Sequence, residues 1–252
     1  MFDLQHVYAV AAMALVFVPL ELALPARKRP HFSAARYTTD LLHVAIGGYV
    51  IRLGTVMLLA MLVPGGTGPA WIAALPLWAQ FIGVLLISDL MFWVAHRIYH
   101  AVPLLWRFHR IHHSSEHLDW LAAFRVHPVD QIINACIIAL PTFLLGFSPV
   151  ALLLFGLIYK WHAILLHSNV RIGFGPLSKL IITPGFHHWH HANQVEAYDK
   201  NFGGQLTIWD RMFGTFYEGP QDRPDRYGVE NPPRETFLTH ILEPFKPGKR
   251  NG

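Results

Sequence analysis

The chain has 252 residues, a formal net charge of +4, 53% apolar residues, 14% charged residues and one cysteine, Cys136. Soluble domains carry about 25% charged residues, so much of this surface is expected to face lipid. A single cysteine excludes a disulfide framework and a cysteine-based zinc site. The basic residues gather at the ends of apolar segments and form no stripe, which favours a membrane surface over nucleic acid as the partner.

Long apolar segments predict an all-α fold, a polytopic membrane bundle formed by the whole chain, residues 1–252. A helix needs about 20 residues to cross a bilayer. The apolar stretch from 132 to 166 is too long for one span, and Gly146 to Pro149 should break it into a hairpin. The expected spans are residues 4–24, 41–63, 71–95, 132–146 and 149–166.

The two ends of the chain differ in character. No basic residue precedes the first span, which therefore reads as an anchor and not as a cleaved signal peptide. The tail, residues 218–252, is rich in proline and charge, and we expect it to be extended and largely non-helical. No internal repeat is visible.

Basic residues predict the orientation of the spans. Arg27, Lys28 and Arg29 follow the first span, and further basic residues follow the third and the fifth. The intervening turns, residues 64–70 and 146–148, carry no charge. This asymmetry places the N-terminus outside and the later histidines on the cytoplasmic side, in a bacterial inner membrane.

Histidine is the unusual residue, with 17 in the chain and 13 of them between His96 and His191. Residues at i, i+3 and i+4 share one face of a helix, and eight histidines follow this spacing. Imidazole suits iron, zinc and copper, and one tetrahedral zinc takes at most four ligands. Eight ligands therefore predict two metals. The three clusters are His96/His100, His109/His112/His113 and His187/His190/His191.

Other histidines stand alone. His127, His162 and His167 lie at the ends of the expected hairpin, at the depth of the clusters, and are candidate ligands. His188 is about 100° round the helix from His187 and is left out of the ligand set. The remaining ones have no metal-site pattern: His6, His31, His43, His117 and His240.

An acidic residue inside the third span, Asp89, falls on one helical stripe with Trp93, His96 and His100. An ionisable residue within a span is a functional candidate. Asp89 could accept the second N–H of a ligand histidine, or it could neutralise Arg52 in the neighbouring span. The sequence leaves both roles open.

The histidine pattern resembles the fatty acid hydroxylase/sterol desaturase superfamily, whose HxxxH, HxxHH and HxxHH boxes match the three clusters. The sequences between and after the boxes are also similar to the family's: Arg125-x-His127-Pro128, His167-Ser168-Asn169, Thr183-Pro184, and the segments that start at Asp199 and Trp209. The resemblance covers residues 86–217, the expected catalytic region.

The resemblance implies a helical bundle with a cytoplasmic, histidine-lined helical cap that holds two irons. It implies hydroxylation or desaturation of a lipid with O₂ as co-substrate. It adds His127 and His167 to the metal ligands, and it makes Asp89 and Asp199 candidates for residues that support the ligands. The chain shows no GxGxxG fingerprint, cluster cysteines or CxxCH haem site. Electrons are therefore expected from a small carrier such as a ferredoxin or a cytochrome.

Two alternatives compete with an oxygenase. His113, Glu116 and His117 fit the HxxEH pattern of an inverted zinc protease. A non-catalytic haem or metal membrane protein is the other alternative, although such proteins place single histidines in mid-span. A protease of this kind would use Glu116 as a general base beside zinc.

Overall fold

The computed structural model describes residues 4–28, 33–62 and 68–246, and all regular elements among these residues are helical. The expected all-α membrane class is confirmed. Several sequence predictions fall outside the described residues, namely those for Arg29, His31, Val63, Pro247 and residues 64–67 of the first uncharged turn.

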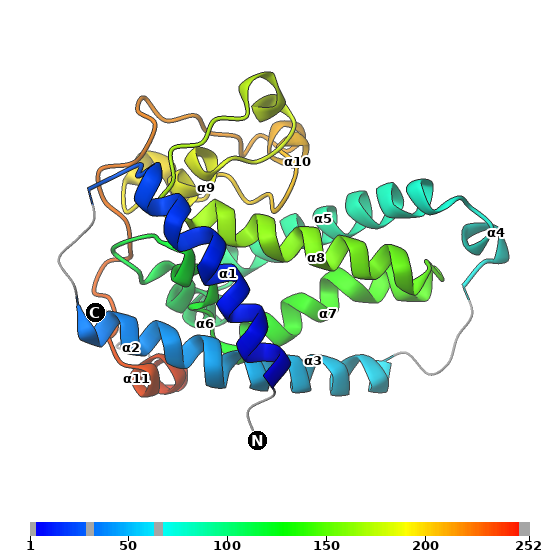
Figure 1. Cartoon of the computed structure of the whole chain (residues 1–252), viewed down its shortest axis with the longest axis horizontal. Helices are drawn as coiled ribbons and strands as arrows, with labels where there is room; N and C mark the ends of the chain where they lie inside the picture. The colour runs from blue at the N-terminus through cyan, green and yellow to red at the C-terminus, as the bar shows by residue number, and fades with distance from the viewer. Residues whose placement is uncertain (1–3, 29–32, 63–67, 247–252) are drawn as a thin grey trace.

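The longer helices form a bundle that runs toward one end of the molecule, where α4 lies (Figure 1). Three helical segments are long and apolar enough to cross a membrane, the 29-residue helix Ala34–Leu62, the helix Leu77–Ala101 and the helix Pro149–His167. Two shorter apolar helices accompany them, over Val7–Ala23 and Pro128–Leu144. The elements of the bundle are α1 (Leu4–Ala23), α2 (Ala34–Leu42), the π-helical turn η1 (His43–Gly47), α3 (Gly48–Leu62), α4 (Ala70–Ala73), α5 (Leu77–Ala101), α7 (Pro128–Leu144) and α8 (Pro149–His167).

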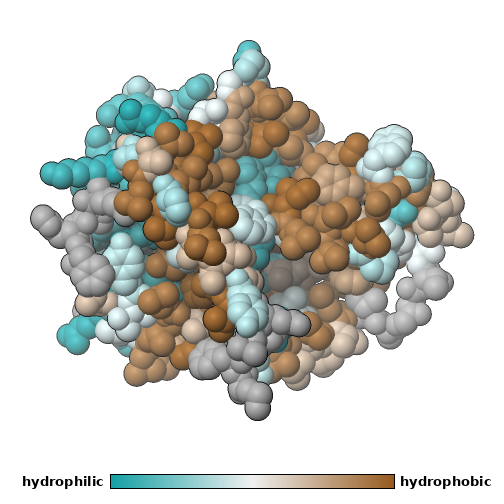
Figure 2. All heavy atoms as spheres, in the orientation of Figure 1, coloured by the Kyte–Doolittle hydropathy of each residue, from teal (hydrophilic) through white to brown (hydrophobic). Residues whose placement is uncertain are grey.

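Short elements form a cap at the other end of the bundle. The cap contains α6 (Pro103–His113), η2 (Trp120–Phe124), η3 (Gly175–Lys179), α9 (Pro184–His190), η4 (Val195–Ala197), α10 (Ile208–Met212), α11 (Phe237–Leu242) and η5 (Glu243–Phe245). Apolar side chains cover much of the bundle face seen in Figure 2, whereas hydrophilic side chains gather at the upper left, near α9 and the tail.

Prolines set the starts of the helices that carry histidines. Pro103, Pro128, Pro149 and Pro184 each stand in the first turn of their helix, where the missing N–H costs nothing and the fixed φ suits the helix. Pro103 also ends α5, because Val102 before it is extended, with φ −100° and ψ 113°. The resulting turn lays α6 back against the last turns of α5.

One expected span boundary is wrong, and the tail contains one short α-helix. The third span was expected at residues 71–95, but Pro76 separates the short α4 from α5, which begins at Leu77 and continues to Ala101. The proline cannot donate the helical hydrogen bond that would join the two. The described part of the tail, residues 218–246, is largely non-helical as expected, but it contains α11, whose N-cap Thr236 accepts a hydrogen bond from the Thr239 N–H.

Candidate metal centre

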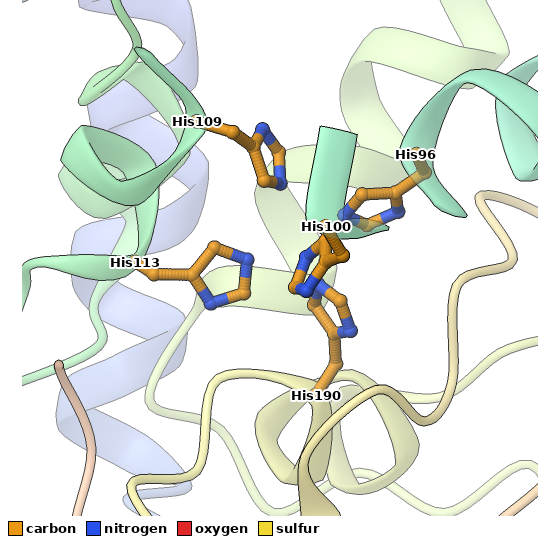
Figure 3. A group of neighbouring side chains, drawn as sticks. All are labelled: His96, His100, His109, His113 and His190. Carbon is orange, nitrogen blue, oxygen red and sulfur yellow. The ribbon is translucent and has the colours of Figure 1, made fainter. Parts of the chain in front are cut away.

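Nine buried or nearly buried histidines converge in two groups at the junction of bundle and cap. The first group draws its imidazoles from α5, α6 and α9, and its five rings point toward one another (Figure 3). The second group draws them from α6, the end of α8 and α9. The first group is His96, His100, His109, His113 and His190, and the second is His112, His167, His187 and His191.

The second group has the spacing of ligands around one metal. The Nε2 atom of His167 lies 3.1 Å from the Nε2 atoms of both His112 and His187, and His187 Nε2 lies 3.2 Å from His191 Nε2. Two nitrogens bound at about 2.0–2.1 Å to one metal, at cis or tetrahedral angles, lie roughly 2.8–3.4 Å apart. The printed separations fall inside that range.

The tautomers of the second group also require a cation. His112 Nδ1 donates to the Arg125 carbonyl at 3.2 Å, and His167 Nδ1 donates to the Ala163 carbonyl at 2.7 Å. A neutral imidazole has one N–H, so the Nε2 atoms of these rings hold lone pairs. Two lone pairs that face each other at 3.1 Å repel unless a cation lies between them. The donor set therefore fits a metal ion.

The first group shows the same preference for Nε2. Its five Nε2 atoms are buried and have no hydrogen-bond partner among the described residues. Two of the rings are fixed at the opposite nitrogen by backbone carbonyls, His96 Nδ1 by Phe202 at 2.8 Å and His190 Nδ1 by Lys200 at 2.8 Å. Buried polar atoms without partners are costly, and a metal would satisfy them. Both groups therefore fit metal ions.

Burial favours the neutral form of five cap histidines. For His112, His113, His187 and His191, burial and then the neighbouring histidines lower the pKa well below the usual value. Burial also lowers the pKa of His190 to about 3, against a hydrogen bond to the Lys200 carbonyl. A neutral imidazole offers the lone pair that a metal needs.

The histidine-rich part of the chain matches a known protein family. Residues 81–215, more than half of the sequence, match the family described as fatty acid hydroxylase. The chain belongs to the fatty acid hydroxylase family. It is therefore an oxidoreductase of the fatty acid hydroxylase type. No solved structure matches the chain.

Two kinds of curated relative extend this membership. The ornithine lipid hydroxylase OlsE of Rhizobium tropici is 28% identical over 97% of this chain and 75% of its own length. The alkylglycerol monooxygenases of Danio rerio and Homo sapiens are each 34% identical, over 64% and 68% of this chain. The chain spans only about a third of the length of these monooxygenases, 34% and 35% respectively.

The paired histidines of each box divide between the two groups of this hydroxylase-type site. His112 and His113 are neighbours in α6, yet His112 belongs to the second group and His113 to the first. His190 and His191 likewise separate. Successive residues of a helix point about 100° apart, so the two members of each HH pair face different groups, and residues at i and i+4 face the same group.

The structure does not bring three of the lone histidines to either group. His127 is the N-cap of α7, where its Nδ1 accepts from the Val129 N–H, and its Nε2 bonds the Ile241 carbonyl at 3.1 Å. Both ring nitrogens are thus used, so the expected ligand role of His127 is not supported. His162 bonds Gln205 and the Ile182 carbonyl, and His188 bonds the Tyr227 hydroxyl.

Carboxylates hold two ligand rings of the first group. Asp130 Oδ2 accepts from His109 Nδ1 at 2.9 Å, and both residues are buried. Asp199 Oδ1 lies 3.5 Å from His100 Nδ1, and its own side chain is 75% exposed. Sequence reasoning missed Asp130. Its signal was its place in the first turn of α7, where an acidic residue is favoured.

Two further aspartates shape the loop that supports His96. Asp210 accepts from the N–H groups of Phe202 and Gly203 at 2.9 and 2.8 Å, and the Phe202 carbonyl accepts from His96. Asp89 accepts from the N–H groups of Gln205 and Leu206 at 2.7 and 3.0 Å. Asp89 thus acts through the loop, a role that the sequence did not suggest, and Asp210 is a supporting residue that it missed.

The protease alternative does not fit this geometry. A zinc protease would need His113 and His117 on one metal, but His117 is exposed and belongs to neither group. Glu116, the proposed base, is exposed as well. The HxxEH match is therefore accidental.

Proposed function

We propose that this chain is a membrane-bound di-iron oxygenase that hydroxylates or desaturates a C–H bond of a lipid, with O₂ and externally supplied electrons. The observation that carries the proposal is the pair of buried histidine groups, each with its ring nitrogens converged on one point. Nitrogen donors also suit zinc and copper. Membership in a hydroxylase family makes iron the metal that fits the chemistry.

The relatives support a lipid as the substrate. By their names, one acts on ornithine lipids and the others on alkylglycerols. These substrates differ in headgroup but share long alkyl chains, and a bundle with an apolar surface can take such a chain from the bilayer. We therefore propose that the substrate is a lipid with a long alkyl chain. Experiment must identify the carbon atom that is oxidised.

The chain's residues would hold and shield the irons. The five-histidine group and the four-histidine group would each bind one, and bound iron would supply the activation of O₂ that acid–base side chains cannot provide. Asp130, Phe202 and Arg125 fix the tautomers of His109, His96 and His112 through their oxygens. Such partners orient the ligand rings and raise their basicity.

The burial of the site separates it from water. Eight of the nine histidines are less than 9% exposed, and His100 is only slightly more so. A dry site protects reactive species from side reactions. The reducing equivalents must then enter from outside, and we assign them to a small ferredoxin or cytochrome that docks on the cap.

The cap is proposed to be cytoplasmic. Basic residues follow the first, third and fifth apolar segments on its side, and basic residues are enriched on the cytoplasmic side of membranes. A reduced carrier would be available there. In this orientation the bundle end near α4 faces the opposite side.

A direct test supplies reduced carrier and isotopically heavy O₂ to purified, iron-loaded protein in lipid nanodiscs. Mass spectrometry should detect a lipid that has gained one heavy oxygen atom, or one that has lost two hydrogens. His112→Ala should abolish both the product and iron at the second group. Turnover that continues under strict exclusion of O₂ would refute the oxygenase.

A further inference from the structure

A cavity of about 410 Å³ lies at the polar end of α1, beside the histidine groups. Its walls come from segments that directly follow the ligands, because Glu116 lies three residues after His113, and Asn169 and Asn193 lie two residues after His167 and His191. The volume is typical of ligand pockets, which measure about 300–1,000 Å³. A molecule bound in this cavity would contact segments that directly follow the ligand histidines.

Charged side chains from both ends of the chain line this cavity. Arg27 and Lys28 follow α1, and Arg226 comes from the tail, while Glu116 and Asp225 supply two carboxylates. Within the described part of the chain, no ion pair joins any of these cations to either carboxylate. Three cations face two carboxylates in the wall of this cavity, and the excess of positive charge attracts an anionic ligand.

The Arg27 side chain is held in place. Its Nη1 and Nη2 atoms donate to the Pro224 and Asp225 carbonyls, each at 2.9 Å, and its guanidinium lies 5.1 Å from the centre of the Tyr227 ring. Asn169 also clamps the Arg27 backbone, through the Arg27 N–H and carbonyl at 2.9 Å each. The end of α1 is therefore tied to the tail around the cavity, close to α9 (Figure 1).

A second cavity of about 200 Å³ adjoins the first, and apolar atoms form most of its wall although Glu21, Arg36 and Asp119 also line it. The two share His117, Leu118 and Asn169, and the second extends between Val18 of α1 and Tyr37 of α2. On the remaining surface of α1, apolar side chains such as Leu15 and Leu22 are 77% and 61% exposed. A charged cavity that joins an apolar one at a lipid-facing helix suits a molecule with a headgroup and an alkyl chain.

We propose that these cavities bind the substrate lipid by its headgroup, with a phosphate or carboxylate against Arg27, Lys28 and Arg226 and the start of a chain beside Val18. The proposal rests on the proposed function for the identity of the lipid as substrate. The binding itself does not depend on catalysis and can be measured separately.

The test measures lipid binding in a neutral detergent. Dioctanoyl phosphatidylglycerol supplies the anionic headgroup, dioctanoylglycerol has the same chains without charge, and glycerol phosphate has the charge without chains. The double variant Lys28→Gln/Arg226→Gln removes two exposed cations, and Lys179→Gln, on the exposed η3, is the matched control for surface charge. The rise in thermal unfolding temperature with ligand concentration gives each dissociation constant.

We expect the double variant to bind phosphatidylglycerol about tenfold more weakly than the native protein. Dioctanoylglycerol should bind all proteins alike, and Lys179→Gln should behave as native. Equal phosphatidylglycerol binding by the double variant and the native protein would overturn the proposal. So would glycerol phosphate binding as tightly as the lipid, because the cavity would then take a soluble anion.

Iron content and product formation are measured on the same preparations. Lipid binding that depends on Lys28 and Arg226 in a protein without hydroxylation would uphold the headgroup site and refute the proposed function. Hydroxylation by a protein whose lipid binding is unchanged in the double variant would uphold the proposed function and refute the headgroup site.

Discussion

Single carboxylates decide how well the ligand histidines are held. Asp130 is the clearest case, since its buried carboxylate accepts the N–H of His109. Asp130→Asn keeps the shape but removes the charge, and residues of this kind change metal affinity by about 10–100-fold. We expect iron to leave the variant faster during chelator titration. Glu196→Gln, at an exposed site, should leave iron retention unchanged. Native-like retention in Asp130→Asn would contradict this role.

Asp210 should affect the fold rather than only the metal. Its carboxylate accepts from the Phe202 and Gly203 N–H groups, from the Trp93 indole and from the Thr215 hydroxyl. An amide at this place turns an N–H toward other donors. Asp210→Asn is expected to lower the stability by about 2–4 kcal/mol, and the unfolding temperature of iron-free protein should fall. If the temperature changes only in iron-loaded protein, the loop is not held by Asp210.

Sequence reasoning reached most of the site at this scale, but not all of it. Spacing alone identified eight of the nine converging histidines, because a repeated i, i+3, i+4 pattern rarely arises by chance. His167 was a candidate from its depth at the end of the hairpin, and the family resemblance added it to the ligands. The wrong ligand role of His127 and the missed role of Asp130 have one cause. The hydrogen-bond partner of a histidine ring nitrogen can come from a distant segment of the chain. The Ile241 carbonyl is hydrogen-bonded to His127 Nε2, and the Asp130 carboxylate accepts a hydrogen bond from His109 Nδ1.

At the scale of elements, a buried ion pair ties the tail to the bundle. Arg125 pairs with Asp40 of α2 at 2.7 Å and with Glu235 of the tail at 2.8 Å, and the backbone carbonyl of Arg125 accepts from His112. The pair therefore connects α2 and the tail to the second histidine group.

Replacing Arg125 alone should lower the stability of the protein more than replacing Arg125 and Asp40 together. Arg125→Met leaves the buried Asp40 carboxylate uncompensated, which costs roughly 3–5 kcal/mol. Arg125→Met combined with Asp40→Asn removes that charge and should recover part of the loss. Thermal unfolding of both variants measures the difference. A double variant less stable than Arg125→Met alone would contradict a simple charge-pair explanation.

Helix boundaries were predictable where proline or glycine marked them, and less so elsewhere. The break before Pro149 could be foreseen, and Gly146 there adopts a φ of +75°, which suits glycine. The start of α5 was missed because Trp71 to Leu75 is as apolar as the helix after Pro76. Apolar composition locates a span, and local backbone chemistry sets its ends.

At the scale of the whole molecule, the account requires the cap to lie on one side of the membrane. Cysteines at the exposed positions Glu116 and Ser178, and at Ala35 at the start of α2, mark the cap end of the bundle in a Cys136→Ala background, and Ala74→Cys marks the other end. We expect an impermeant thiol reagent to label only the Ala74 site in intact cells. Labelling of one cap site alone would separate segments that the histidine groups join.

The number of irons per chain tests the central claim most directly. Protein purified under reducing, iron-replete conditions should contain about two irons per chain by elemental analysis, since two histidine groups are present. His109→Ala/His113→Ala and His187→Ala/His191→Ala each disable one group and should each retain about one iron. A native protein that carries a single zinc regardless of iron supply would contradict a centre of two irons. The same conclusion would follow if one double variant lost all metal while the other kept the native amount.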